Sequence, residues 1–209
     1  MNARAVARWI AALLQDGGTV ALSGGSTPEP VYEALAAEPL PWERIQWFFG
    51  DERFVPPDDA LSNFRMAHEA MLWRAPPQLV HPVPTVGLSA DAAAERYEQG
   101  LRSFFGETPR FDATFLGLGP DGHTASLFPD SPALEETRRW CRAVQAHGQQ
   151  RVTLTFPILN ASAHVAFLAA GEEKRPMLQK LQAGDNTLPA ARIRPQGELR
   201  FFVDSKAAP

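Results

Sequence analysis

The loop GLGPDGHTASLFP at residues 117–129 carries the side chain best suited to proton transfer. An imidazole titrates near neutral pH, so His123 can take a proton from a water molecule. Asp121 lies two residues earlier and is placed to orient the ring or to contact a substrate. A lone histidine is more often structural or merely exposed. A glycine-flanked loop that follows an apolar strand gives a histidine little packing value, which favours the functional interpretation.

Residues 117–122 of this loop also match the spacing Gly-x-Gly-x-x-Gly. We do not predict a dinucleotide site, because Pro120 interrupts the turn and no second strand ends in an acidic residue about 20 positions later. His123, His147 and His164 show no compact metal-ligand spacing. The sequence therefore predicts neither a metal nor another cofactor.

A second loop, LSGGSTP at residues 22–28, has the composition of a phosphate cradle. Gly24 and Gly25 let the backbone approach an anion, while Ser26 and Thr27 offer hydroxyl groups at the start of a predicted helix. The loop is neither a Walker A motif nor a nucleophile elbow. An equally strong alternative is a tight turn in which Ser26 or Thr27 only caps the helix.

Two further segments supply cations. The segment GDERFVPPDD at residues 50–59 contains Arg53, which can bind a phosphate with two parallel hydrogen bonds, and Asp51, which can hold Arg53 or contact sugar hydroxyls. The alternative for this segment is a solvated charged turn. Lys174 falls in the first turn of a predicted helix, where the helix dipole disfavours a cation unless an anion compensates. The alternative for Lys174 is an ordinary solvated lysine.

Short apolar strands and helical patterns alternate along the chain, which predicts an α/β fold with a largely parallel sheet covered on both faces. Ligands bind such sheets at the carboxyl ends of the strands, where all these loops begin. The predicted strands are 19–22, 45–49, 113–118, 151–155, 164–169 and 199–203. The predicted helices are an amphipathic N-terminal helix that ends near Gly17-Gly18, then 28–35, 63–72 capped by Ser62, 90–105 capped by Ser89, and 172–181.

Bulk properties predict one domain over residues 1–209. The net charge of −4 argues against a nucleic-acid partner, and no run approaches 18 apolar residues, so no membrane partner is expected. A single cysteine, Cys141, excludes a disulfide within the chain and favours a cytoplasmic location.

Five segments together resemble the 6-phosphogluconolactonase family, which belongs to a larger group that includes glucosamine-6-phosphate deaminases. They are ALSGGSTPEPVYEAL, GDERFVPPDDALSNFRMA, LGLGPDGHTASLFPDS, RVTLTFPILNASAHVAFLAAGEEK and the closing FFVD. The resemblance runs from about residue 3 to residue 204, and five motifs in the right order make it specific. Members of the family commonly have a longer N-terminus than this chain.

The resemblance implies a Rossmann-like three-layer α/β/α sandwich with a mostly parallel central sheet. It implies hydrolysis of 6-phospho-D-glucono-1,5-lactone, a sugar-phosphate lactone, in the oxidative pentose phosphate pathway. His123 is then the general base. Gly24, Gly25, Ser26 and Thr27 form part of the substrate pocket, and Arg53 and Lys174 are the cationic ligands. We expect both cations to hold the substrate's phosphate, and we expect a monomer or a weak homodimer.

Two rival functions stay open at this point. A deaminase or isomerase on the same fold usually carries a motif such as DGHIAFNEP around its histidine. This chain reads DGHTASLFP and lacks the glutamate of that motif. A non-catalytic sugar-phosphate sensor normally comes with a DNA-binding partner, for which this chain has no room. A generic serine hydrolase is a more distant alternative.

Overall fold

The computed structural model describes residues 1–209, and its centre is a five-stranded sheet in the order β2-β1-β4-β7-β8. Every neighbouring pair in this sheet is parallel. The five strands are β1 (Gly18–Leu22), β2 (Ile45–Phe49), β4 (Ala113–Gly117), β7 (His164–Ala169) and β8 (Glu198–Val203). The middle strands are almost entirely apolar and buried, as expected for parallel strands covered on both faces.

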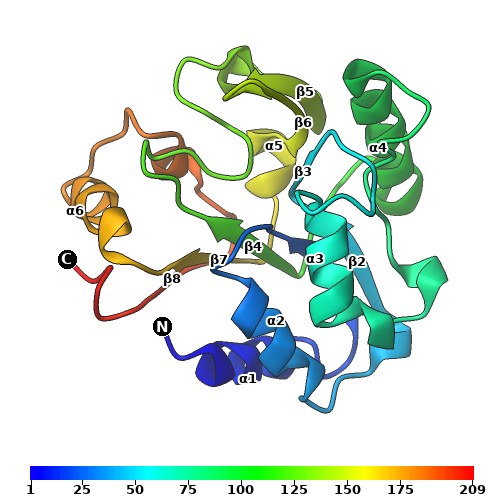
Figure 1. The fold of residues 1–209 in the computed structure, drawn as a ribbon, viewed down its shortest axis with the longest axis horizontal. Helices are drawn as coiled ribbons and strands as arrows, with labels where there is room; N and C mark the ends of the chain where they lie inside the picture. The colour runs from blue at the N-terminus through cyan, green and yellow to red at the C-terminus, as the bar shows by residue number, and fades with distance from the viewer.

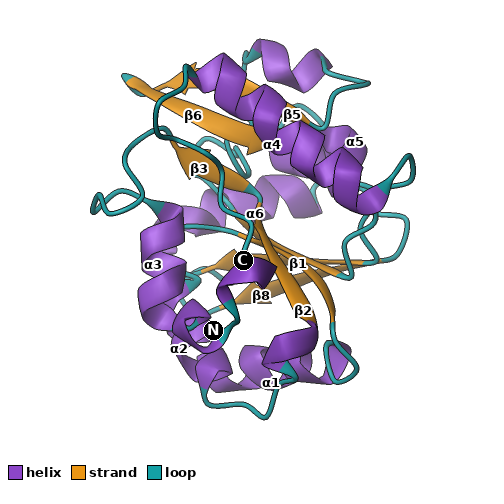
Figure 2. Ribbon diagram, turned by 90° about the vertical axis from the view of Figure 1, so that its right-hand side faces the viewer, coloured by secondary structure: helices purple, strands orange, loops and turns teal.

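Helices cover both faces of the sheet (Figures 1 and 2). The helices are α1 (Ala3–Leu13), α2 (Glu29–Ala36), α3 (Asn63–Ala70), α4 (Ala90–Phe105), α5 (Phe156–Leu159) and α6 (Arg175–Gln182). Both views place α1 and α2 on one side of the sheet and α4 and α5 on the other. The predicted three-layer α/β/α fold with a parallel central sheet is confirmed. No helix combines the length and the apolar character needed to span a bilayer.

Three strands form a separate antiparallel sheet in the order β3-β6-β5. They are β3 (Asp51–Arg53), β5 (Cys141–Ala146) and β6 (Gln149–Leu154). Gly50 connects the two sheets, because its N–H donates to Leu22 O at 2.7 Å and its carbonyl accepts from Leu154 N at 2.8 Å. One hydrophobic cluster contains buried residues of both sheets, among them Val20 and Val152, so the sheets share a core.

Most predicted boundaries lie within two residues of the observed ones. Ser62 and Ser89 cap α3 and α4 as predicted, each accepting a backbone N–H three residues on. Two details were wrong. The strand predicted at 151–155 is β6 of the antiparallel sheet and not a strand of the parallel one. Lys174 ends a short 3₁₀ turn, Glu172–Lys174, and lies just before α6 instead of inside its first turn.

Candidate active site

The site lies where the strand order of the parallel sheet reverses. After β1 the chain moves to β2 on one side, whereas β4, β7 and β8 are added on the other side of β1. The loops that leave the carboxyl ends of β1 and β4 therefore diverge and open a crevice between them. The loop after β1 is the Gly-Gly-Ser-Thr segment, and the loop after β4 carries His123.

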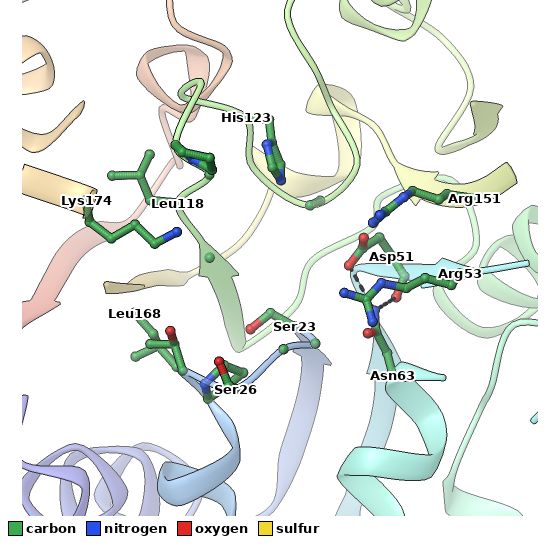
Figure 3. Close-up of a pocket in the computed structure, with 18 residues that line it drawn as sticks. Ser23, Ser26, Asp51, Arg53, Asn63, Leu118, His123, Arg151, Leu168 and Lys174 are labelled. Atoms are coloured by element: carbon green, nitrogen blue, oxygen red, sulfur yellow. Dashed lines mark hydrogen bonds between the residues drawn. The ribbon is translucent and has the colours of Figure 1, made fainter. Parts of the chain in front are cut away.

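A pocket of about 220 Å³ fills this crevice (Figure 3). Eight of the nine predicted site residues line it: Gly24, Gly25, Ser26, Thr27, Asp51, Arg53, His123 and Lys174. The ninth, Asp121, is not part of the lining and contacts the ring of His123. The structure thus brings together side chains from four separate segments of the chain, and their roles stay predictions.

Asp121 fixes the orientation of the His123 ring. Its Oδ1 lies 2.5 Å from His123 Nδ1 and also accepts the backbone N–H of His123 at 3.1 Å. An ionised carboxylate only accepts hydrogen bonds, so Nδ1 carries the proton and Nε2 keeps its lone pair. Phe128 packs against the ring with 4.1 Å between centroids. A Cβ atom at Gly119 would lie 2.0 Å from His123 Nδ1, so only glycine fits there.

Burial lowers the pKa of His123, and the hydrogen bond and charge of Asp121 oppose this effect without cancelling it. Burial also raises the pKa of Asp121, but its hydrogen bonds with the backbone and ring of His123 outweigh that effect, so the pKa is lowered overall. At neutral pH the pair therefore consists of a neutral imidazole and an ionised carboxylate. A neutral imidazole with a free Nε2 is the form that accepts a proton.

The Gly-Gly-Ser-Thr loop leaves its polar groups available. Helix α2 begins without any side-chain cap, and Pro28 occupies the N-cap position. The alternative in which Ser26 or Thr27 only caps this helix is therefore wrong. Gly25 adopts φ +100°, and a Cβ atom at Gly24 would lie 1.7 Å from Asn63 Oδ1. The two glycines thus allow both the turn and the close approach of the Asn63 amide.

The segment Asp51–Arg53 is the ordered strand β3, so its alternative interpretation as a solvated turn is also wrong. Asp51 is buried, and its Oδ2 accepts a hydrogen bond from Ser126 Oγ at 2.6 Å. Asn63 Nδ2 donates to Asp51 O at 2.8 Å. Arg53 NH1 donates to Leu61 O at 2.7 Å. These bonds hold Asp51, Arg53 and Asn63 together as one wall of the pocket (Figure 3).

Three polar residues of the pocket were not predicted: Ser23, Asn63 and Arg151. Each has a buried side-chain atom without a hydrogen-bond partner, as does Arg53, and these atoms are Ser23 Oγ, Asn63 Oδ1, Arg53 Nε and Arg151 Nε. Buried polar groups are normally paired, so four unpaired atoms around one pocket point to a polar ligand.

Figure 3 shows the cations on two sides of the pocket. Lys174 lies with Ser26 on one side, and its side chain is only 18% exposed. Arg53 and Arg151 lie on the other side, next to Asp51. His123 projects from above, between the two sides. The arrangement suits an elongated ligand with negative charge at both ends.

Comparison with known proteins identifies the family. Residues 2–201 match the family model described as glucosamine-6-phosphate isomerases/6-phosphogluconolactonase. A 6-phosphogluconolactonase from Nostoc sp. is 46% identical over 198 residues, which cover 90% of this chain and 82% of the relative. A human 6-phosphogluconolactonase is 39% identical over 201 residues, which cover 90% of this chain and 78% of the relative.

Solved structures agree with these matches. The crystal structure of 6-phosphogluconolactonase from Thermotoga maritima superposes with a TM-score of 0.87 at 38% identity, covering 96% of this chain and 94% of that one. A monomeric glucosamine-6-phosphate deaminase superposes with a TM-score of 0.85 at 20% identity, which shows a common fold. The chain belongs to the 6-phosphogluconolactonase family, within the wider group that also contains the glucosamine-6-phosphate isomerases.

Proposed function

We propose that this protein hydrolyses 6-phospho-D-glucono-1,5-lactone to 6-phospho-D-gluconate, a step of the oxidative pentose phosphate pathway, with His123 as the general base. One observation carries the proposal: a neutral imidazole, oriented by Asp121, faces a pocket with cations on two sides. The reactant is a phosphorylated ester, and its product carries a carboxylate at one end and a phosphate at the other. The relatives described above act, by their names, on the same lactone.

The phosphate is assigned to the side of the pocket that holds Lys174. There the Ser26 and Thr27 hydroxyls and the backbone N–H groups of the glycine loop, which have no partner within the fold, would surround an anion. Because Arg53 lies on the opposite side, it is assigned to the sugar end and not to the phosphate. This assignment replaces the expectation that Arg53 and Lys174 bind the same group.

The chemistry follows from the free Nε2 of His123. It takes a proton from water, and the water oxygen forms a bond to the lactone carbonyl carbon while the carbonyl electrons move onto oxygen. When this tetrahedral oxyanion collapses, the bond from carbon to the ring oxygen breaks, and the imidazolium returns its proton to that oxygen. The acid formed then ionises to the carboxylate. A δ-lactone is a reactive ester, so one base and a fixed substrate suffice.

Amino-sugar deamination is the nearest alternative, and the neighbour of His123 argues against it. The deaminase motif DGHIAFNEP has a glutamate at the position where this chain has Phe128. Phe128 packs on the imidazole with 4.1 Å between ring centroids, so an apolar ring occupies the place of that carboxylate. Asp121 is then the only carboxylate hydrogen-bonded to His123.

The decisive assay follows acid release from freshly prepared lactone, corrected for spontaneous hydrolysis. We expect the wild-type protein to hydrolyse the lactone. We expect His123→Ala to lower kcat by about 10²–10⁴ while the Kd for 6-phosphogluconate changes little. His147→Asn is the matched control. His147 packs edge-on against Phe128, is exposed, and has φ 51°, which asparagine tolerates.

Two outcomes would contradict the proposal. Near wild-type turnover in His123→Ala removes the histidine from the mechanism. Ammonia release from glucosamine 6-phosphate, without lactone hydrolysis, assigns the protein to the deaminases. A cytoplasmic location, a single domain and a monomeric or weakly dimeric state stay predictions that this assay does not address.

A further inference from the structure

Arg53 and Arg151 are directly opposite each other on neighbouring strands. They form a Cα pair in the antiparallel ladder between β3 and β6. Like charges opposite each other in a sheet repel and destabilise the pairing. The pair lines the pocket, so the repulsion is located where a ligand binds. An anion between the two guanidinium groups would remove it.

Arg151 is the less compensated member of this pair. Arg53 donates to Leu61 O, whereas the Arg151 side chain makes no hydrogen bond or salt bridge and its buried Nε is unpaired. The nearby carboxylate, Asp51, already accepts hydrogen bonds from Ser126 and Asn63. Burial lowers the pKa of Arg151, the expected effect on a cation without a partner, but a guanidinium stays charged at neutral pH.

Arg151 also lies close to the base. Phe128 contacts both groups: its ring centroid is 4.1 Å from that of His123 and 5.4 Å from the Arg151 guanidinium carbon. The charge of Arg151 acts on His123, as do those of Asp121 and Asp51. Lys174 lies across the pocket (Figure 3). Arg151 is therefore the unpaired cation beside the place where water activated by His123 would attack the lactone.

We propose that Arg151 is a catalytic residue that binds the oxyanion formed at the lactone carbonyl and then the carboxylate of the product. The inference rests on the proposed hydrolase function. The negative charge develops on the former carbonyl oxygen only after water has added, so a cation held there in advance stabilises the transition state more than the neutral ester. The two sides of the pocket then match the two charged ends of the product.

Steady-state kinetics test the catalytic role. Arg151→Ala is expected to lower kcat by about 10²–10³, the usual loss for one oxyanion donor, with a much smaller change in KM. Added guanidinium ion is expected to restore part of the lost rate, which a purely structural defect would not allow. Arg142→Ala is the control, because Arg142 lies in the same small sheet but pairs with Glu136 outside the pocket.

Ligand binding tests the assignment of the two sides. Calorimetry would compare 6-phosphogluconate with glucitol 6-phosphate, which lacks the carboxylate. Arg151→Ala is expected to weaken the first at least about tenfold and to leave the second nearly unchanged, because only the first has a carboxylate that loses a charged hydrogen-bond partner. Lys174→Ala is expected to weaken both ligands equally.

Several outcomes would overturn the inference. Wild-type kcat in Arg151→Ala refutes the catalytic role, and equal weakening of both ligands by that variant makes Arg151 a phosphate ligand instead. Arg151→Gln, which removes the charge but keeps most of the side chain's length, provides a second variant if Arg151→Ala unfolds. A kcat well below that of Arg142→Ala supports the inference, and a kcat equal to that of Arg142→Ala refutes it. A wild-type protein inactive on the lactone would instead reject the proposed function itself.

Discussion

At His123, the neighbouring side chains decide what the imidazole does. Asp121 holds Nδ1, Phe128 packs against the ring, and burial keeps the ring neutral. Each effect leaves Nε2 free to accept a proton. Gly119 contributes by having no side chain, because a Cβ atom there would overlap the ring. The ability of His123 to act as a base therefore depends on several residues of the loop after β4.

The pH profile is the direct readout of this arrangement. Burial lowers the pKa of His123, so kcat/KM is expected to be constant near neutral pH and to fall about tenfold per pH unit below a midpoint under about 6.5. The sign follows because the active form is the unprotonated one, which is lost as pH falls through the pKa. Asp121→Asn removes an interaction that raises this pKa and should shift the midpoint to lower pH.

Asp130→Asn is the matched control for that shift. Asp130 is an exposed carboxylate farther along the same loop, and its φ of 62° is tolerated by asparagine. The pH profile of kcat/KM for Asp130→Asn should have the same midpoint as that of the wild type. A wild-type midpoint above the ordinary histidine value, or no acid limb at all, would contradict the assignment of the base.

Single site residues could be predicted from the sequence where one short loop contains all the groups that indicate their role. His123 and the Gly24-Gly25 pair are of this kind, since glycine, hydroxyl and imidazole groups stand next to each other in the chain. Arg151 and Asn63 could not be predicted, because their meaning depends on partners from distant segments. Arg151 matters through Arg53, and Asn63 matters through the space left by Gly24.

Among the elements, β3 and α3 act as one unit, and Glu52 joins them. The carboxylate of Glu52 accepts hydrogen bonds from Asn63 N at 2.7 Å, Phe64 N at 2.8 Å and Ser62 Oγ at 3.1 Å. It therefore fixes the start of α3 against the strand that carries Arg53. The Asn63 amide reaches the pocket from this fixed position.

The pH dependence of stability should reveal this buried carboxyl group. Burial raises the pKa of Glu52 to about 7, opposed by hydrogen bonds from the start of α3. The unfolded chain then loses this proton at lower pH than the folded one, so the stability contributed by Glu52 falls as pH rises from about 4.5 to about 7. The unfolding free energy of the wild type relative to Glu52→Gln should fall across this window by on the order of 3 kcal/mol.

Urea unfolding at several pH values measures this difference. Glu69→Gln, on the exposed part of α3, controls for the removal of a carboxylate from the same helix. A wild-type to Glu52→Gln difference that does not change between pH 5 and pH 8 would show that Glu52 stays ionised in the fold.

Elements were predictable from the sequence when hydrophobic periodicity or a capping serine marked them. The helix at residues 90–105 and the strand at 45–49 match the structure at both ends. Strand β3 was missed because its three residues, Asp-Glu-Arg, are charged and are buried through hydrogen bonds instead of apolar contacts. The pairing of β6 was misassigned because a short apolar run does not reveal whether its neighbour is parallel.

At the scale of the molecule, the pocket is where two sheets meet. The parallel sheet supplies the Gly-Gly-Ser-Thr loop, His123 and Lys174, and the antiparallel sheet supplies Arg53 and Arg151. The position of the parallel part was predictable, since ligands bind at the carboxyl ends of the strands. The contribution of the second sheet was not, because it depends on β3 pairing with a strand about 100 residues later.

A ligand that contacts both sheets should stabilise the fold as a unit. At a 6-phosphogluconate concentration of about 100 times its Kd, binding adds about 2.7 kcal/mol, and for a chain of this size we expect Tm to rise by about 5–10 °C. Gluconate and inorganic phosphate each match only one side of the pocket, so either alone at the same concentration should give a smaller rise. A thermal scan with each ligand, and with the two fragments mixed, measures the difference. If gluconate or inorganic phosphate alone gives as large a rise as 6-phosphogluconate, one side of the pocket accounts for the whole effect, and the division of the pocket into a phosphate side and a carboxylate side is wrong.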